Sequence, residues 1–237
     1  MKLKETVIGG RKCYTGKQGE GTPEYLLIQA TDEHEAEFLE HEVETIEEKS
    51  GARFGFAAFQ VKSWNGDLSP WEAPPVFGNE PFGSGAEDTL RYIQDELVPE
   101  VSEELGLEQD VKIIIGGYSL SAFFALWSMV KSGNFAGVAA SSPSVWFPGW
   151  IDLLADWADK KSGSCNIPVY LSLGNKEPKT RNPLMQTVGD RIEETFEILK
   201  DRAGCDAELE WNQGNHFKEP DIRTAKGFAW CLNRLSH

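Results

Sequence analysis

A nearly unbroken apolar run, Val111-Lys-Ile-Ile-Ile-Gly-Gly117, stands directly before an apolar helical segment, Leu120–Lys131. An apolar run of this kind is typical of a strand that is buried on both faces of a parallel sheet. Parallel strands need long crossover connections, usually helices, so the rest of the chain should alternate between strands and helices. This one feature therefore points to the α/β class.

The remaining sequence shows that alternation. The predicted strands are 25–30, 54–61, 111–117, 135–141, 168–173 and 207–212, and the predicted helices are 33–49, 87–105, 120–131, 151–161, 183–202 and 221–235. Pro99 should bend the second of these helices. No repeat or linker divides the chain, so residues 1–237 are expected to form a single domain. We expect a mostly parallel central sheet with helices on both faces, and 237 residues leave no room for a large lid domain.

Composition excludes several classes of function. A net charge of −15 argues against nucleic-acid and anionic-membrane partners. No apolar stretch is long enough to span a membrane and no secretory signal is visible, so a cytoplasmic location is expected. Four scattered cysteines predict neither a zinc site nor a disulfide scaffold, and the glycine spacings of phosphate-binding loops are absent. No metal or cofactor is expected. Nine acids crowd residues 31–50, and we expect them to form a solvated helix face.

A candidate nucleophile lies between the buried strand and the helix after it. The segment Gly116-Gly-Tyr-Ser-Leu-Ser-Ala122 approximates the nucleophile elbow G-x-S-x-G, in which a strained turn lifts the serine Oγ above the sheet. Gly117 supplies the first small residue, and Ser121 stands where the pattern has its second glycine. We therefore interpret Ser119 as a nucleophile. The alternative is a turn in which the serine only caps the helix.

A serine nucleophile needs a base, and the chain has four histidines. His34 and His41 lie two turns apart in the acidic helix, where surface positions are favoured over a metal pair, and His237 is the terminal residue. His216 stands in a loop after the last predicted strand, which is the position of the base in an α/β-hydrolase. The alternative is a loop histidine that is bonded to the backbone.

The third member of a triad should follow the strand 168–173. Glu177 is the only carboxylate between that strand and Asp190. We predict that it fixes the tautomer of His216 and stabilises the imidazolium ion. Surface ion pairs with the neighbouring cations Lys176, Lys179 and Arg181 are the alternative.

The surrounding loops suggest the rest of the site. An oxyanion hole needs two donors; we expect one from the Leu120 backbone and one near Trp64 or Asn65, in the loop after strand 54–61. Four tryptophans that follow strands predict an aromatic substrate cleft, with core packing as the alternative for each: Trp64, Trp71, Trp146 and Trp150.

These motifs resemble those of small bacterial esterases of the α/β-hydrolase superfamily. The group is related to esterase D, S-formylglutathione hydrolases, feruloyl esterases and enterochelin-type esterases. The resemblance runs roughly over residues 25–230 and is carried by 64–71, 117–121 with 144–148, 173–177 and 214–217. It implies an α/β-hydrolase fold and a metal-free serine hydrolase with Ser119, His216 and Glu177 as its triad.

Three departures from the family pattern matter. Ser121 replaces a glycine, and the acid is a glutamate where aspartate is commoner. The separate N-terminal substrate domain of enterochelin esterases has no counterpart, so the resemblance gives no support to a siderophore substrate.

The sequence thus predicts a cytoplasmic carboxylic-ester hydrolase that acts on a small-molecule ester through an acyl-Ser119 intermediate. Two alternatives stay open: an acyltransferase or thioesterase with the same triad, and a non-catalytic binding protein with this fold. No sequence feature predicts an oligomeric state.

Overall fold

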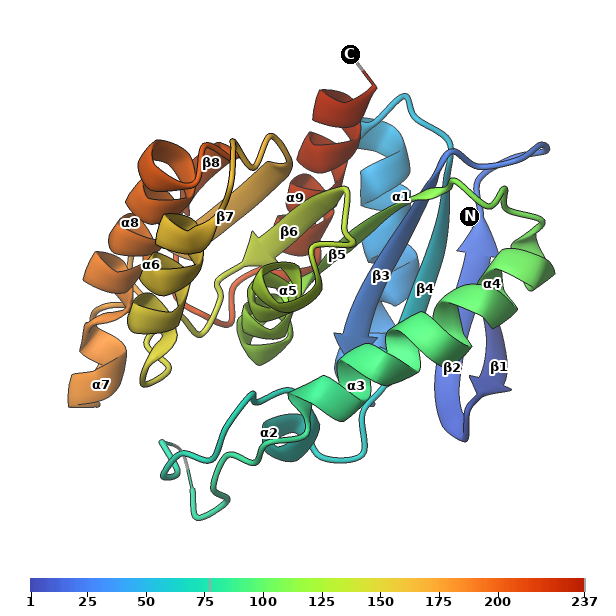
Figure 1. Cartoon of the computed structure of the whole chain (residues 1–237). Coiled ribbons are helices and arrows are strands. Elements are labelled where there is room, and N and C mark those ends of the chain that lie inside the picture. The colour runs from blue at the N-terminus through green and yellow to red at the C-terminus, as the bar shows by residue number, and fades with distance from the viewer. Residues whose placement is uncertain (77, 237) are drawn as a thin grey trace.

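The centre of the molecule is a mixed β-sheet, seen in a computed structural model that describes residues 1–76 and 78–236 (Figure 1). Its strands are β1 (Lys4–Ile8), β2 (Arg11–Lys17), β3 (Tyr25–Thr31), β4 (Phe54–Gln60), β5 (Lys112–Tyr118), β6 (Gly137–Ser141), β7 (Pro168–Gly174) and β8 (Asp206–Asn212). Within the described residues their order is β1-β2-β4-β3-β5-β6-β7-β8. The pairs β1–β2 and β2–β4 are antiparallel, and the other pairs are parallel.

Helices cover both faces of this sheet. They are α1 (Leu39–Lys49), α2 (Trp64–Asp67), α3 (Ala86–Tyr92), α4 (Val98–Leu105), α5 (Ser119–Ser132), α6 (Trp150–Lys160), α7 (Pro183–Gln186), α8 (Val188–Glu197) and α9 (Pro220–Leu235). Helices α1 and α9 pack on one face, and α3, α4, α5, α6 and α8 lie on the other (Figure 1). The mostly parallel sheet with helices on both faces, predicted from the sequence, is confirmed.

Burial explains why the central segments are so apolar. Every residue of β3, β6 and β7 is buried, because helices shield both faces of the sheet. Helix α5 is enclosed along most of its length, so it is apolar nearly all round instead of amphipathic.

The sequence prediction missed an N-terminal hairpin. Strands β1 and β2 are joined by Gly9 and Gly10, which pair Ile8 directly with Arg11. Both glycines have positive φ, 55° and 73°, as a tight two-residue hairpin turn requires. The Gly-Gly pair was the available signal, but β1 exposes most of its residues and lacks an apolar run.

The long helix predicted around Pro99 is one helical run from Ala86 to Leu105 in three parts. A wider, π-helical turn, Ile93–Leu97, ends two residues before the proline. Proline lacks an N–H and crowds the carbonyl four residues earlier, here that of Asp95. The Asp95 carbonyl lies in the π-helical turn. The proline therefore explains why the regular α-helical geometry is interrupted at this place.

Helix α1 carries the expected acidic face with one exception. Leu39, Val43 and Ile46 are buried against the sheet, and Glu40, Glu44 and Glu48 face solvent. Glu42 is buried, so the expectation that all the acids of this segment are solvated was wrong.

The segment between β4 and α3 contains, in its described part, only the short helix α2 and one bridge between Ala73 and Phe82. Nothing resembling a large lid domain occurs in the described parts of the chain. In residues 1–76 and 78–236 no helix combines the length and the apolarity that crossing a bilayer requires.

Candidate active site

Ser119 lies in the sharp turn where β5 passes into α5. Its φ is 58°, in the left-handed region that side-chain-bearing residues rarely adopt. Such a conformation costs on the order of 1–3 kcal/mol and persists only where the surrounding structure enforces it. The turn has the strained geometry of a nucleophile elbow, as the sequence predicted.

Gly117 and Ser121 hold the strand and the helix together at this turn. Gly117 has a φ of 149°, and a Cβ atom built on it would lie 2.9 Å from the Ser121 Cβ and closer still to its hydroxyl. The Ser121 hydroxyl donates a hydrogen bond to the Ala30 carbonyl at 3.0 Å. The serine thus fills space next to Gly117 and ties α5 to the end of β3.

We expect Gly117→Ala to lower the melting temperature sharply, because it adds both a positive-φ side chain and a collision with Ser121. Ser121→Gly should be much milder, since it loses one buried hydrogen bond worth about 1 kcal/mol. Thermal unfolding of both single variants and the double variant measures the coupling. The double variant should recover part of the loss. Strict additivity of the two effects would contradict this account of the turn.

Ser119, His216 and Glu177 form one hydrogen-bonded chain. The Ser119 Oγ lies 3.0 Å from His216 Nε2, and His216 Nδ1 lies 2.7 Å from Glu177 Oε2. The three residues follow β5, β8 and β7, so the carboxyl ends of these strands bring together residues that are far apart in the sequence. A base within reach of a hydroxyl, held from behind by a carboxylate, can activate that hydroxyl for attack.

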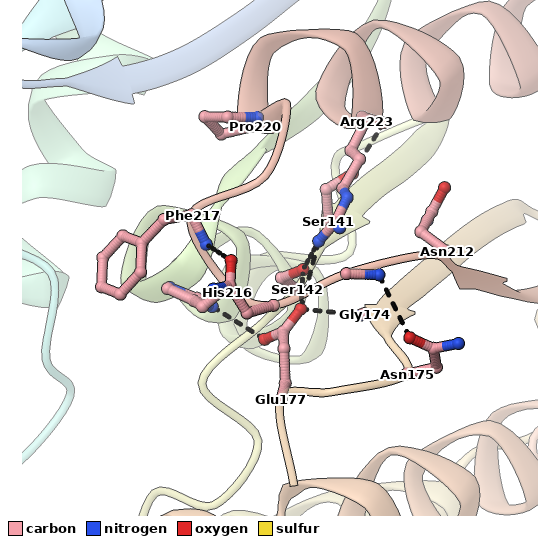
Figure 2. A network of polar contacts seen from close by, with 12 residues as sticks. Ser141, Ser142, Gly174, Asn175, Glu177, Asn212, His216, Phe217, Pro220 and Arg223 are labelled. Atoms are coloured by element: carbon pink, nitrogen blue, oxygen red, sulfur yellow. Dashed lines mark hydrogen bonds and ion pairs between the residues drawn. The ribbon is translucent and has the colours of Figure 1, made fainter. Parts of the chain in front are cut away.

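The Glu177 carboxylate is nearly buried and heavily hydrogen-bonded (Figure 2). Its Oε1 accepts from the Ser142 hydroxyl and the Gly174 N–H, both at 2.7 Å. Burial alone would raise the pKa of Glu177, but the hydrogen bonds from His216, Ser142 and Gly174 outweigh it and hold the pKa below 4.5. The carboxylate is therefore ionised at neutral pH and faces the imidazole as an anion.

Arg223 of α9 is a further member of this network that the sequence reading did not identify. Its side chain is 2% exposed and points toward Glu177 (Figure 2). Its Nη1 lies 3.3 Å from Glu177 Oε1 and 3.1 Å from the Tyr118 hydroxyl. Tyr118 in turn donates to the His216 carbonyl at 2.6 Å. Arg223 and Tyr118 therefore brace the acid and the histidine loop from behind. No local sequence motif distinguishes a buried arginine on an amphipathic helix.

A small cavity of about 50 Å³ opens at Ser119. Its lining residues are Ser119, Ser142, Pro143, Ser144, Trp146, Glu177, Met185, Val188 and His216. Beside it, Phe217 is 84% exposed, and its ring points away from Glu177 (Figure 2). Both an enclosed cavity and an exposed apolar surface are therefore available next to the triad.

The four tryptophans differ in their placement. Trp146 lines the cavity, whereas Trp71 is partly exposed and donates from Nε1 to the Pro148 carbonyl. Trp64 is partly buried at the start of α2. Trp150 has no exposed surface; it packs on Phe123, and its Nε1 donates to the Thr195 hydroxyl, so its expected place in the cleft is corrected to the core.

The sheet order shows which loop begins beside the elbow. The strand that pairs with β5 is β3, and β4 lies one strand farther out. The loop that begins beside the elbow therefore starts after Thr31, not after β4. Trp64 and Asn65 begin α2, and neither lines the cavity at Ser119; the Asn65 amide donates to the Glu80 carbonyl. Leu120 is the second residue of α5, where backbone N–H groups lack helical partners.

The other histidines lie elsewhere. His41 pairs with Asp221 at 2.6 Å, His34 packs edge-on against Phe38, and His237 falls outside the described residues. In the part of the chain that the structure describes, no three His, Cys, Asp or Glu residues cluster as metal ligands would.

Comparison with known proteins decides the family. A family model described as "Putative esterase" matches residues 56–203, more than half of the chain. The chain belongs to this esterase family. The model places it among ester-hydrolysing enzymes, as its sequence motifs predicted. No protein of curated function shows significant sequence similarity to this esterase.

Solved structures of similar fold include several hydrolases. An IroE-like serine hydrolase from Shewanella oneidensis has a TM-score of 0.78 at 14% identity, over 98% of this esterase and 80% of that chain. The siderophore hydrolase EstA from Aspergillus nidulans has a TM-score of 0.77 at 15% identity, over 99% and 94%. The enterobactin and salmochelin hydrolase IroE has a TM-score of 0.63 at 17% identity, over 99% and 94%. These similarities establish the α/β-hydrolase fold.

Proposed function

We propose that this esterase hydrolyses small carboxylic esters through a covalent acyl intermediate on Ser119. The observation that carries the proposal is the continuous chain from the Ser119 Oγ through both nitrogens of His216 to Glu177 Oε2, at 3.0 and 2.7 Å. Glu177 is the orienting acid in this assignment, and the family match supports ester chemistry.

In the first half-reaction the Ser119 Oγ attacks the ester carbonyl carbon while His216 Nε2 takes the hydroxyl proton. The carbonyl oxygen becomes an oxyanion at the amino end of α5, where we assign the Leu120 N–H, in the first turn of that helix, as one donor. We assign the second donor to the backbone after Thr31. Collapse of the intermediate breaks the bond to the alcohol oxygen, which receives the proton from His216 and leaves.

The second half-reaction repeats these steps with water. His216 takes a proton from the water, the hydroxide attacks the acyl carbon, and the bond to Ser119 breaks. The proton returns to the Ser119 Oγ and releases a carboxylic acid. The ionised Glu177 stabilises the imidazolium ion that forms in both halves.

The acyl acceptor separates hydrolysis from the rival activities. An acyltransferase would pass the acyl group to an alcohol or amine, and a thioesterase would release a thiol. The match to a family of esterases favours water as the acceptor. Burst kinetics on p-nitrophenyl acetate, with and without competing alcohols, measure this partition.

The names of the structural neighbours bear on the substrate. We predicted that a siderophore substrate lacks support because a separate N-terminal domain is missing. EstA and IroE, named as siderophore, enterobactin and salmochelin hydrolases, match this esterase over 94% of their length. The absence of an additional domain is therefore no argument against a siderophore substrate. Siderophore esters should be tested as substrates beside simple acyl esters. We also retain the proposal that residues 1–237 form one domain, which the single sheet supports.

A fluorophosphonate probe tests the nucleophile. We expect one equivalent of label on the tryptic peptide that contains Ser119, and none after the Ser119→Ala change. Ser144→Ala serves as the control, because Ser144 lines the same cavity and its side chain has no part in the triad. Label on another residue, or no label on folded protein, would overturn the assignment.

A further inference from the structure

Two of the four cysteines meet at the amino ends of β7 and β8, at the end of the sheet opposite to the triad. Cys165 lies in the segment that leads into β7, and Cys205 directly precedes β8. These two segments run side by side. The Cys165 N–H donates to the Ala203 carbonyl at 2.8 Å, and the Asp206 N–H donates to the Ile167 carbonyl at 3.0 Å. Neighbouring parallel strands bring distant residues together, so the separation of the two cysteines in the sequence concealed this pair.

The two segments are in direct contact. The Gly204 carbonyl accepts from the Asn166 N–H at 3.1 Å and from the Ser164 hydroxyl at 2.6 Å. A Cβ atom built on Gly204 would lie 3.5 Å from the Ser164 Cα atom. The Cys165 and Cys205 thiols hydrogen-bond each other. A disulfide holds its sulfur atoms about 2.05 Å apart, so two thiols already in contact need only a small movement to form one.

The two thiols differ in exposure and in acidity. Cys165 is partly exposed, whereas Cys205 is 5% exposed. The hydrogen bond with Cys205 lowers the pKa of Cys165 from 9.0 to about 7, and the charge of Lys161 lowers it further. The same hydrogen bond, together with burial, raises the pKa of Cys205. The pair thus consists of an accessible thiol that ionises near neutral pH and a buried thiol behind it. This combination is typical of redox-responsive cysteines.

Cys13 and Cys231 do not share this arrangement. Neither has exposed surface, and burial raises the pKa of both. The Cys13 Sγ atom lies 3.3 Å from the Tyr92 hydroxyl, and the Cys231 Sγ atom donates to a backbone carbonyl at 3.3 Å. Among the described residues, no further His, Cys, Asp or Glu joins the pair at β7 and β8 to complete a set of metal ligands. The chemistry open to that pair is therefore the chemistry of a dithiol.

We propose that Cys165 and Cys205 form a reversible disulfide on reaction with a low-molecular-weight disulfide such as glutathione disulfide. The Cys165 thiolate attacks one sulfur of the reagent, whose S–S bond breaks, and the first glutathione leaves as a thiolate. The Cys205 sulfur then attacks the Cys165 sulfur, and the second glutathione leaves with the proton of Cys205. The two cysteine sulfurs are oxidised to one disulfide, and one glutathione disulfide is reduced to two glutathione molecules.

The disulfide would stabilise the fold without reaching the triad. It closes the stretch that contains β7, the Glu177 loop, α7 and α8, and so restricts the unfolded chain. The melting temperature of the oxidised protein should exceed that of the reduced protein by about 5–15 °C. Strand β7 is seven residues long, which separates the pair from the triad by roughly 20 Å. The kcat/KM of the proposed ester hydrolysis should therefore be unchanged.

Peptide mapping of the full-length protein tests the proposal. Reduced protein is incubated with glutathione disulfide, its remaining thiols are alkylated with iodoacetamide in denaturant, and the tryptic peptides are analysed without reduction. Cys165 and Cys205 fall on separate peptides, 162–176 and 203–218. We expect these peptides to be joined, with two hydrogens fewer than the separate pair, and to be released by dithiothreitol. Cys13 and Cys231 should be alkylated. Thermal unfolding of the same samples measures the stabilisation.

Three variants separate the steps. Cys205→Ala should stop at the mixed disulfide, with one glutathione on peptide 162–176, and Cys165→Ser should form neither the mixed disulfide nor the link. Cys231→Ala is the matched control: it removes a buried cysteine outside the pair and should still form the link. A wild-type protein that keeps both thiols free, that accumulates the mixed disulfide, or whose melting temperature stays the same after linkage would overturn the proposal. Neither readout depends on turnover, so failure of the proposed hydrolysis would be recognised separately.

Discussion

Replacement of Ser119 by alanine should lower kcat/KM for p-nitrophenyl acetate by about 10⁴- to 10⁶-fold, the range seen when a serine nucleophile is removed. The remaining groups, the base and the oxyanion donors, would have no covalent route to the product. Alanine keeps the Cβ atom at the same positive φ, so the strain of the elbow persists and the melting temperature should change little. Stopped-flow kinetics should also show that the acyl burst disappears.

The control for this change is Ser128→Ala in the same helix. Ser128 is also buried, and its hydroxyl has no partner in the described structure, so alanine should be tolerated with full activity. If the Ser128→Ala variant also lost activity, the loss in Ser119→Ala would indicate damage to α5 and not the removal of a nucleophile. Near-normal turnover by Ser119→Ala on several esters would rule out the acyl-Ser119 mechanism.

Replacement of Glu177 by glutamine should lower kcat/KM by about 10³- to 10⁴-fold. A glutamine amide placed against His216 Nδ1 donates to it, which forces the ring proton onto Nε2, the atom 3.0 Å from the Ser119 Oγ. The imidazole can then no longer accept the serine proton. The same change leaves the buried Arg223 without its anion and should cost about 3 kcal/mol of stability or more.

The double variant Glu177→Gln with Arg223→Met separates these two effects. Removing the cation should recover much of the stability, as measured by urea unfolding, while kcat/KM stays low. The pH dependence gives a second check. Because the pKa of Glu177 is lowered in the folded state, its stabilising contribution is present above pH 4.5 and is lost as pH falls through the folded-state pKa. Glu177→Gln should remove this dependence, and wild-type turnover by the variant would contradict the assigned role.

The sequence allowed the fold class and the chain of Ser119, His216 and Glu177 to be predicted for a common reason. Parallel strands end at one edge of the sheet, so residues just after β5, β7 and β8 are brought together whatever their separation in sequence. Strand periodicity reveals where each strand ends. When a candidate nucleophile, acid and base each follow one of three such strands, the three residues are therefore predicted to lie close together.

Other features depend on information that local patterns do not contain. The order of strands in the sheet decides which loop adjoins the elbow. Because β3 and β4 are interchanged relative to their order in the chain, the loop with Trp64 and Asn65 begins one strand farther from β5, and neither residue lines the cavity at Ser119. Helix packing decides that Trp150 enters the core, that Glu42 is enclosed and that Arg223 reaches Glu177. Each of these requires knowing which face of a helix meets which neighbour.

The contact between Gly117 and Ser121 also has an evolutionary consequence. In a protein with serine at 121, position 117 accepts only glycine, because the Ser121 side chain occupies the space that a side chain at 117 would need. The reverse path is open: position 121 can return to glycine first, at the cost of the bond to Ala30. Substitutions at these two sites are thus accessible in one order only. Among relatives of this esterase, we expect a serine at 121 to occur together with glycine at 117, and the positive φ at 117 favours glycine there even where 121 is glycine.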